Sequence, residues 1–260
     1  MTDAVLRLSS LTVALGEETV LDRISFEVPV DGTVAIAGEA GAGKSVCALS
    51  ILRLTRVNST TIQGRIEFAG RDLLTMPEEA LRDIRGEGIG LALPDALHPC
   101  FRLADQVAEA VQAHHPIGRM AARDRAIDLL EAVGIQRPHA AGGRYPGGLT
   151  LLERRLGSLA IALANGPQLL IADDPTGGLD EQDSAAVEAL LGQVQCAVLL
   201  TTRDRKLAAR CADMMLTLEQ GHITERLARI QAEHEPEPTL EVQVVRRRRG
   251  GLLGRWRRRS

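Results

Sequence analysis

The chain has 260 residues and a net charge of −3, and 45% of its residues are hydrophobic and 25% charged. These values are typical of a soluble protein with one large domain or two small ones. Aromatic residues make up only 2% of the chain, which argues against the stacking platforms that single-stranded nucleic acids need, so we expect no nucleic-acid partner.

The sequence also argues against a membrane span and a secreted protein. No apolar run approaches the ~18 residues that cross a bilayer, and the first residues lack the pattern of a signal peptide. Because the four cysteines have no CxxC spacing, we expect reduced, buried thiols rather than a metal site or disulfides. They are Cys47, Cys100, Cys196 and Cys211.

The first third of the chain predicts strands around one glycine-rich segment. Alternating apolar residues predict strands over 4–14 and 20–29, and a short apolar strand over 33–38 leads into that segment. The elements expected next are a helix over 43–54, a strand over 64–70, a helix over 77–86 and a buried strand over 89–93.

Helical periodicity dominates after residue 94. Helices are expected over 103–113, 119–133 and 150–165, with a loop rich in Gly, Pro and His over 134–148. The body ends with a strand over 168–174, a helix over 181–193, a strand over 197–202, a helix over 204–211 and two short strands that finish near residue 227.

The glycine-rich segment matches the pattern G-x-x-x-x-G-K-[ST] between a strand and a helix. Its glycines allow backbone N–H groups to surround phosphate oxygens, and the helix N-terminus adds a positive dipole end. Lys44 can reach the β- and γ-phosphates, and Ser45 can bind Mg²⁺. The predicted nucleotide-binding residues are Gly38, Glu39, Ala40, Gly41, Ala42, Gly43, Lys44, Ser45 and Val46.

A second motif follows in the strand over 168–174. An apolar run there ends at Asp173, at the edge of the sheet where α/β proteins bind ligands. We expect Asp173 to hold Mg²⁺ through water. The element order predicts an α/β fold with a P-loop NTPase (RecA-like) core, N-terminal antiparallel β-strands and an inserted α-helical subdomain. The expected units are a core over 1–94 and 150–227, a helical subdomain over 95–149, a linker over 228–245 and an arginine-rich tail over 246–260.

These motifs and the helical insert resemble the nucleotide-binding subunits of ABC transporters over about residues 4–227. Four stretches resemble more narrowly the ATP-binding subunits of dipeptide, oligopeptide and nickel importers. They are GKSVCALSILRL (43–54), GRIEFAGRDLLTMPEEALRDIRG (64–86), ADQVAEAV (104–111) and LLIADDPTGGLD (169–180). The resemblance implies that two such subunits enclose two ATP molecules and drive a membrane partner between its inward- and outward-facing states.

The chain departs from that family at three positions of the catalytic machinery. Asp174 stands where the family has a glutamate that polarises the attacking water, and Arg203 replaces a histidine that contacts the γ-phosphate. Pro94 replaces a glutamine that senses Mg²⁺ and the membrane partner. A misplacement of ~1 Å can cost about 10²-fold in rate, and arginine cannot act as a neutral imidazole. The sequence therefore predicts impaired hydrolysis, with a fully active enzyme through local compensation as the alternative.

Two further motifs are also altered. The signature LSGGQ, which binds the ATP of the partner subunit, falls on Leu149-Thr150-Leu151-Leu152-Glu153, and a shifted register would use Gly147-Gly148 instead. Leu15 stands near the position of the aromatic residue that stacks on adenine in the family. The aspartate of the family's D-loop is retained as Asp180.

The resemblance predicts an ATP-binding subunit of an importer at the cytoplasmic face of the cell membrane, with ATP and Mg²⁺ as cofactors. The expected partners are a second, more active ATP-binding subunit, two membrane permease subunits and, indirectly, an extracytoplasmic substrate-binding protein. Two alternatives remain: a regulatory or structural subunit that scarcely hydrolyses ATP, and an ABC-type ATPase of a soluble complex.

The end of the chain has its own character. Eight arginines and no acidic residue lie in 246–259, which leaves 23 of the 31 basic residues to balance 34 acidic ones elsewhere. With Trp256, Leu252 and Leu253 among them, the arginines suit the anionic lipid of a membrane surface. A tail that binds nucleic acid and a tail that binds nothing are the alternatives.

Overall fold

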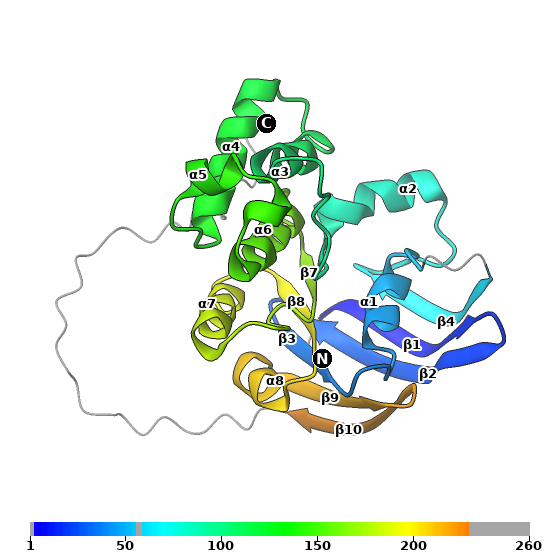
Figure 1. Cartoon of the computed structure of the whole chain (residues 1–260). Helices are drawn as coiled ribbons and strands as arrows, with labels where there is room; N and C mark the ends of the chain where they lie inside the picture. Colours follow the sequence, from blue (N-terminus) through cyan, green and yellow to red (C-terminus); the bar gives the residue numbers. More distant parts are fainter. Residues whose placement is uncertain (1–2, 56–58, 229–260) are drawn as a thin grey trace.

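Two β-sheets form the framework of residues 3–55 and 59–228, the part of the chain that this computed structural model describes. The larger sheet has the strand order β10-β9-β3-β8-β7-β6, and the smaller sheet has the order β2-β1-β4-β5 (Figure 1). In the larger sheet β6, β7, β8, β3 and β9 run parallel, and β10 pairs antiparallel with β9. Its strands are β3 (Thr33–Ala37), β6 (Ile89–Ala92), β7 (Leu169–Asp173), β8 (Ala197–Thr202), β9 (Met214–Glu219) and β10 (His222–Ala228).

The parallel strands are buried on both faces, which explains their continuous apolar sequences. In β7, Leu169 and Ile171 belong to one hydrophobic core, whereas Leu170 and Ala172 belong to a second core on the other face. Successive side chains of a strand point to opposite faces, so the part of a strand that lies between the two cores favours apolar residues at every position. The carboxyl ends of β3, β7 and β8 meet at one edge of the sheet, where the site described below lies.

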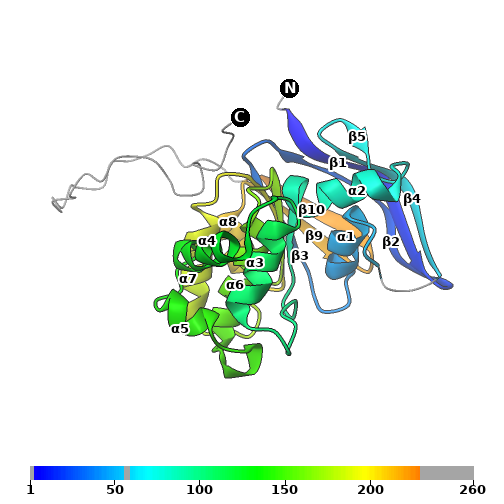
Figure 2. The same cartoon turned by 90° about the horizontal axis from the view of Figure 1, so that it is seen from above.

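The smaller sheet is antiparallel and covers one face of the larger one. Its strands are β1 (Ala4–Leu15), β2 (Glu18–Pro29), β4 (Thr60–Phe68) and β5 (Arg71–Asp72). Helix α1 (Lys44–Ile51) lies between the two sheets (Figure 2), where Cys47 and Ile51 are fully buried. Helix α2 (Glu78–Asp83) and a turn over Ile84–Gly88 lead from the smaller sheet into β6.

Helices on the opposite side of the larger sheet share the second core. They are α3 (Leu103–Gln112), α4 (Arg119–Ala132), α5 (Pro138–Gly142), α6 (Leu151–Leu163), α7 (Glu181–Leu191) and α8 (Arg205–Cys211). Helices α6 and α8 pack on the strands, whereas α3 and α4 pack on α6, and α5 packs on α3 and α4. Gly142 shows how closely they pack, because a Cβ atom there would lie 2.9 Å from the Cβ of Ala104 on α3 and 3.0 Å from Ile127 on α4.

Two expectations from the sequence were wrong in detail. The segment 134–148 is not a loop throughout, because it contains α5 and a short turn over Pro146–Gly148. Proline at the first position favours such a helix, and packing against α3 and α4 stabilises it. Strand β4 begins at Thr60 instead of residue 64, because it pairs with β1 from Leu15 onward. Gly64, with φ of 100°, absorbs the irregularity opposite Ser10.

The cysteines also differ from expectation. The four cysteines form no disulfide with one another, but only Cys47 is buried: Cys196 and Cys211 are partly buried, and Cys100 is exposed. Burial raises the pKa of the Cys47 thiol to about 12 and that of Cys196 to about 11. Within residues 3–55 and 59–228, no helix combines the length and the apolar character that a membrane crossing requires. The predicted linker (228–245) lies outside the described residues except for Ala228, and the tail (246–260) does so entirely.

Candidate functional site

The glycine-rich segment forms a tight loop between the end of β3 and the start of α1. Gly41 and Gly43 have φ of 82° and 102°, in the region that side chains rarely adopt. A Cβ atom at Gly38 would lie 2.3 Å from the Leu218 carbonyl oxygen, and one at Gly43 would lie 2.8 Å from Leu21 Cδ2. These positions therefore require glycine, and the loop presents its backbone at the N-terminus of α1.

Lys44 folds back across this loop. Its Nζ donates hydrogen bonds of 2.7 Å to the carbonyl oxygens of Gly38 and Glu39, and its side chain is buried. Burial lowers the pKa of the Lys44 ammonium, and the carboxylates of Asp174 and Asp173 act in the opposite direction. Because the ammonium donates only to loop carbonyls among the residues that the structure describes, an anion that enters the loop can take over these donors.

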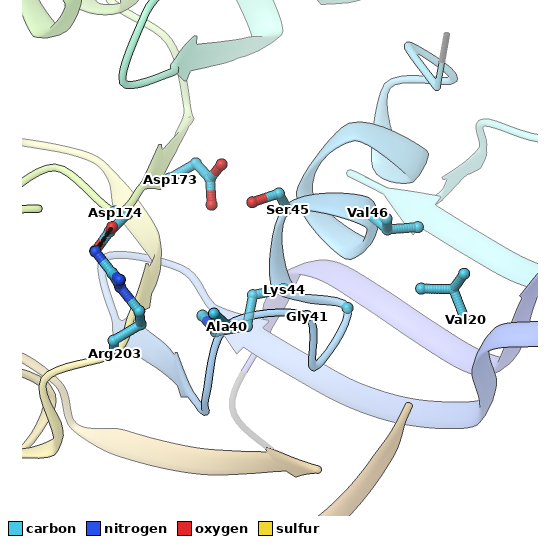
Figure 3. A pocket seen from close by; sticks show the side chains of 10 residues that line it. Val20, Ala40, Gly41, Lys44, Ser45, Val46, Asp173, Asp174 and Arg203 are labelled. Carbon is cyan, nitrogen blue, oxygen red and sulfur yellow. Dashed lines mark hydrogen bonds and ion pairs between the residues drawn. The ribbon is translucent and has the colours of Figure 1, made fainter. Parts of the chain in front are cut away.

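Asp173 ends β7 on the opposite wall of the site. Its side chain is buried, and the hydroxyl of Thr201 on β8 donates a hydrogen bond to Asp173 Oδ1. The Ser45 hydroxyl and the Asp173 carboxylate face each other (Figure 3). Mg²⁺ prefers oxygen ligands and is usually held by one or two carboxylates with substrate phosphates. The chemistry of this pair therefore fits the Mg²⁺ site predicted from the sequence.

Asp174 and Arg203 form an ion pair on the same side of the site. Arg203 Nη2 lies 3.4 Å from Asp174 Oδ2 (Figure 3). Asp174 has a φ of 43°, and its N–H donates to the Thr201 carbonyl oxygen at 3.0 Å. The two residues that the sequence analysis singled out for hydrolysis are thus brought together, and they contact each other.

These groups surround a pocket of about 320 Å³. Two carboxylates and two cations lie toward one side, and apolar side chains of Val20 and Val46 lie toward the other (Figure 3). A phosphate chain beside the cations would direct an attached base toward the valines. The lining residues are Val20, Ala40, Gly41, Gly43, Lys44, Ser45, Val46, Asp173, Asp174 and Arg203.

The lining differs from the predicted set in part. Leu15 does not line the pocket, and Val20 at the start of β2 provides the apolar contact instead. Sequence analysis missed Val20 because no motif distinguishes a valine that lies 24 residues before Lys44. Glu39 and Ala42 line a second hollow of about 620 Å³ on the far side of the loop, and Gly38 lines neither hollow.

The signature candidates lie at the start of α6 and do not line the pocket. Thr150 is the N-cap: its Oγ1 accepts from the Glu153 N–H at 3.1 Å, while Glu153 Oε2 accepts from the Thr150 N–H at 2.8 Å. Leu151 and Leu152 follow in the first turn and are partly buried. The alternative pair, Gly147-Gly148, lies in the turn before the helix.

Asp180 and Pro94 also lie outside the pocket lining. Asp180 is the N-cap of α7, where its Oδ1 accepts from the Asp183 N–H at 2.8 Å. Pro94 follows β6 and is partly buried. The functions predicted for these two residues and for the signature segment remain predictions.

Comparison with known proteins gives concordant results. A family model described as "ABC transporter" matches residues 21–177. The dipeptide transport ATP-binding protein DppD of Escherichia coli (strain K12) is 34% identical over 233 residues, which cover 85% of this chain and 71% of that protein. The peptidoglycan transport ATP-binding protein YejF of Agrobacterium fabrum is 35% identical over 236 residues, which cover 86% of this chain and 43% of YejF.

The oligopeptide transport ATP-binding protein OppD of Mycobacterium tuberculosis is also 35% identical, over 80% of this chain and 35% of OppD. The chain thus spans less than half the length of YejF and OppD. Among solved structures, the dimeric bacterial ABC transporter cassette MJ0796 superposes with a TM-score of 0.77 at 22% identity, covering 86% of this chain and 98% of that one. A second structure of this cassette, bound to ADP and Pi, gives a TM-score of 0.76 at 21% identity. These likenesses confirm the predicted fold class.

Proposed function

Because the chain belongs to the ABC transporter family, we propose that it is the ATP-binding subunit of an importer of the peptide class. The pocket supports this proposal most directly: a glycine-rich loop, Lys44 and Asp173 surround a space for phosphates at the carboxyl edge of a parallel sheet. The printed functions of DppD and OppD, which are transport ATP-binding proteins for dipeptides and oligopeptides, support the substrate class. Such a subunit works at the cytoplasmic face of the cell membrane.

In this proposal the backbone N–H groups of residues 38–45 and the Lys44 ammonium bind the phosphates of ATP. Ser45 and Asp173 hold Mg²⁺, which neutralises charge on the phosphates. Thr150, Leu151, Leu152 and Glu153 contact the ATP of a partner subunit, and Asp180 lies at the same interface. The start of α6 supports the register Leu149–Glu153, because Thr150 is the N-cap and the first N–H groups of the helix point out of its N-terminus at this segment.

Hydrolysis is expected to be weak at this chain's own site. A carboxylate that activates water must be free to approach the proton it accepts. The Asp174 side chain is one methylene shorter than the glutamate of the family, and it folds over Gly177 from a left-handed backbone with φ of 43°. This position of a short carboxylate is the observation that favours a subunit that binds ATP for a regulatory or structural purpose. In an importer, such a chain suits the less active half of an asymmetric pair.

The predicted partners follow from the difference in activity between the two ATP-binding subunits of such a pair. Two copies of this chain would combine the P-loop with a signature that has leucines at residues 151 and 152, and both sites would be poor. A sister subunit with an intact LSGGQ would complete the site built on Lys44. Co-purification with this chain is therefore expected to recover a second, different ATP-binding subunit and two permease subunits, with which a substrate-binding protein associates from outside.

The composition of the purified complex tests this arrangement. A complex with two copies of this chain that transports at ordinary rates would contradict the asymmetry. A complex without permease subunits would instead favour the ABC-type ATPase of a soluble assembly. Quantitative mass spectrometry of the complex, after extraction in mild detergent, separates the three outcomes.

The arginine-rich tail is proposed to bind anionic lipid. Each basic residue near an anionic surface contributes about 1 kcal/mol, and salt screens this attraction. The remainder of the chain is acidic, so the tail would act as a tether through the segment 228–245. Deletion of residues 246–260 is expected to reduce co-sedimentation with anionic liposomes and to leave ATP binding unchanged. Equal sedimentation of both chains at low salt would contradict lipid binding.

A further inference from the structure

Arg203 occupies an unusual place in the phosphate pocket. It follows β8 and lines the pocket together with Lys44, so two cations lie around the same space. Its side chain is 57% exposed, and among the described residues its guanidinium makes one hydrogen bond, to Asp174 Oδ2 at 3.4 Å. A guanidinium carries five donors in a planar fork. Most of this capacity is therefore available to an anion that enters the pocket.

Asp174 is held where it can contact Arg203. Two hydrogen bonds from its N–H to Thr201 fix its backbone in the left-handed conformation, at φ of 43°. Its carboxylate lies over Gly177, where a Cβ atom would come within 2.4 Å of Asp174 Oδ2. The missing side chain at Gly177 thus provides the space into which the carboxylate folds, away from Ser45 and toward Arg203 (Figure 3).

We propose that Arg203 binds the terminal phosphate of the nucleotide and that its ion pair with Asp174 is a latch that this phosphate opens. An exposed ion pair is weak, whereas a guanidinium binds phosphate oxygens through strong, charge-assisted and often bidentate hydrogen bonds. The phosphate therefore displaces Asp174 from Arg203. The inference rests on the proposed ATP-binding function and adds to it the group that distinguishes ATP from ADP.

The latch makes a specific thermodynamic prediction. Arg203→Gln removes the positive charge and the planar fork that meet only the terminal phosphate, so ATP affinity falls by about tenfold or more, while ADP affinity changes little. Asp174→Asn removes the competitor for Arg203, so ATP affinity rises by about two- to fivefold. In the double variant this gain disappears, because no guanidinium remains to be released.

The experiment is a double-mutant cycle with Arg203→Gln, Asp174→Asn and both substitutions, titrated calorimetrically with Mg²⁺-ATP and Mg²⁺-ADP. Arg205→Gln is the matched control. Arg205 is also half exposed and pairs with an acid, Glu225, but it does not line the pocket. Its loss is expected to leave the ratio of ATP to ADP affinity unchanged.

The outcomes distinguish a failure of this inference from a failure of the proposed ATP-binding function. An unchanged ATP-to-ADP ratio in Arg203→Gln contradicts phosphate binding by Arg203, and an equal effect of Asp174→Asn in both backgrounds contradicts the latch. Either result leaves the ATP-binding function intact. Failure of the unaltered chain to bind any nucleotide overturns both. Arg203→Lys provides a second variant if Arg203→Gln unfolds: it keeps the charge but not the fork and is expected to bind ATP with intermediate affinity.

Discussion

Replacement of Lys44 by alanine is expected to abolish ATP binding. Each hydrogen bond from a charged donor contributes about 1.5–3 kcal/mol, and Lys44 would reach two phosphates, so the affinity should fall by about 100-fold or more. The substitution also removes the two hydrogen bonds that join Nζ to the loop carbonyls of Gly38 and Glu39. The loop then loses both its phosphate ligand and its internal support.

The control for this variant is contained in the chain. Lys206 is the only other lysine, and it lies exposed on α8, outside the pocket lining. Lys206→Ala should bind ATP as the unaltered chain does. Because Val20 and Val46 offer the base only apolar contacts, GTP is expected to bind with similar affinity. Unchanged ATP affinity in Lys44→Ala, measured by calorimetry, would remove the basis of the proposed function.

Purified on its own, the chain is expected to hydrolyse ATP far more slowly than roughly 1 per second, a low rate for an enzyme. The Asp174 side chain is one methylene shorter than glutamate, and Arg203 cannot act as a neutral imidazole. Pro94 has no polar side-chain atom at the position of the family's glutamine. All three differences affect the hydrolysis step, so together they should lower the rate of ATP hydrolysis strongly.

Asp174→Glu alone should recover little activity, because Pro94 and the signature segment of a homodimer remain altered. A phosphate-release assay on the isolated chain and on Asp174→Glu measures both rates. Turnover at about 1 per second or faster by the unaltered chain would show that its substitutions are compensated locally.

Most of the fold could be predicted because the determining patterns are local. The apolar run at residues 169–172 and the alternation in residues 4–14 follow from burial on two faces and on one face, respectively. The segment over Pro138–Gly142 escaped prediction because five residues cannot establish a helical period, and contact with α3 and α4 stabilises the helix. The first residues of β4 escaped for a similar reason: they are polar and gain their conformation from pairing with β1.

The same distinction between local patterns and contacts of distant elements applies to the site. Gly41, Gly43 and Lys44 could be predicted because their spacing reflects backbone geometry around phosphate, and Asp173 could be predicted because an apolar strand ends there. The contact between Asp174 and Arg203 could not, because it depends on the left-handed backbone of Asp174 and on the space above Gly177. Likewise, Val20 lines the pocket instead of Leu15, because β2 passes beside the loop at Gly43. This contact joins residues that are far apart in the sequence.

The identity of the nucleotide that stays bound tests the central claim most directly, namely that this chain binds ATP and scarcely hydrolyses it. The purified chain is incubated with Mg²⁺ and ATP labelled in both the base and the γ-phosphate, separated from free nucleotide, and its bound nucleotide is identified after increasing times. The account predicts close to one nucleotide per chain, recovered as ATP through many minutes, and none in Lys44→Ala. Bound nucleotide recovered promptly as ADP, or no bound nucleotide in the unaltered chain, would contradict it.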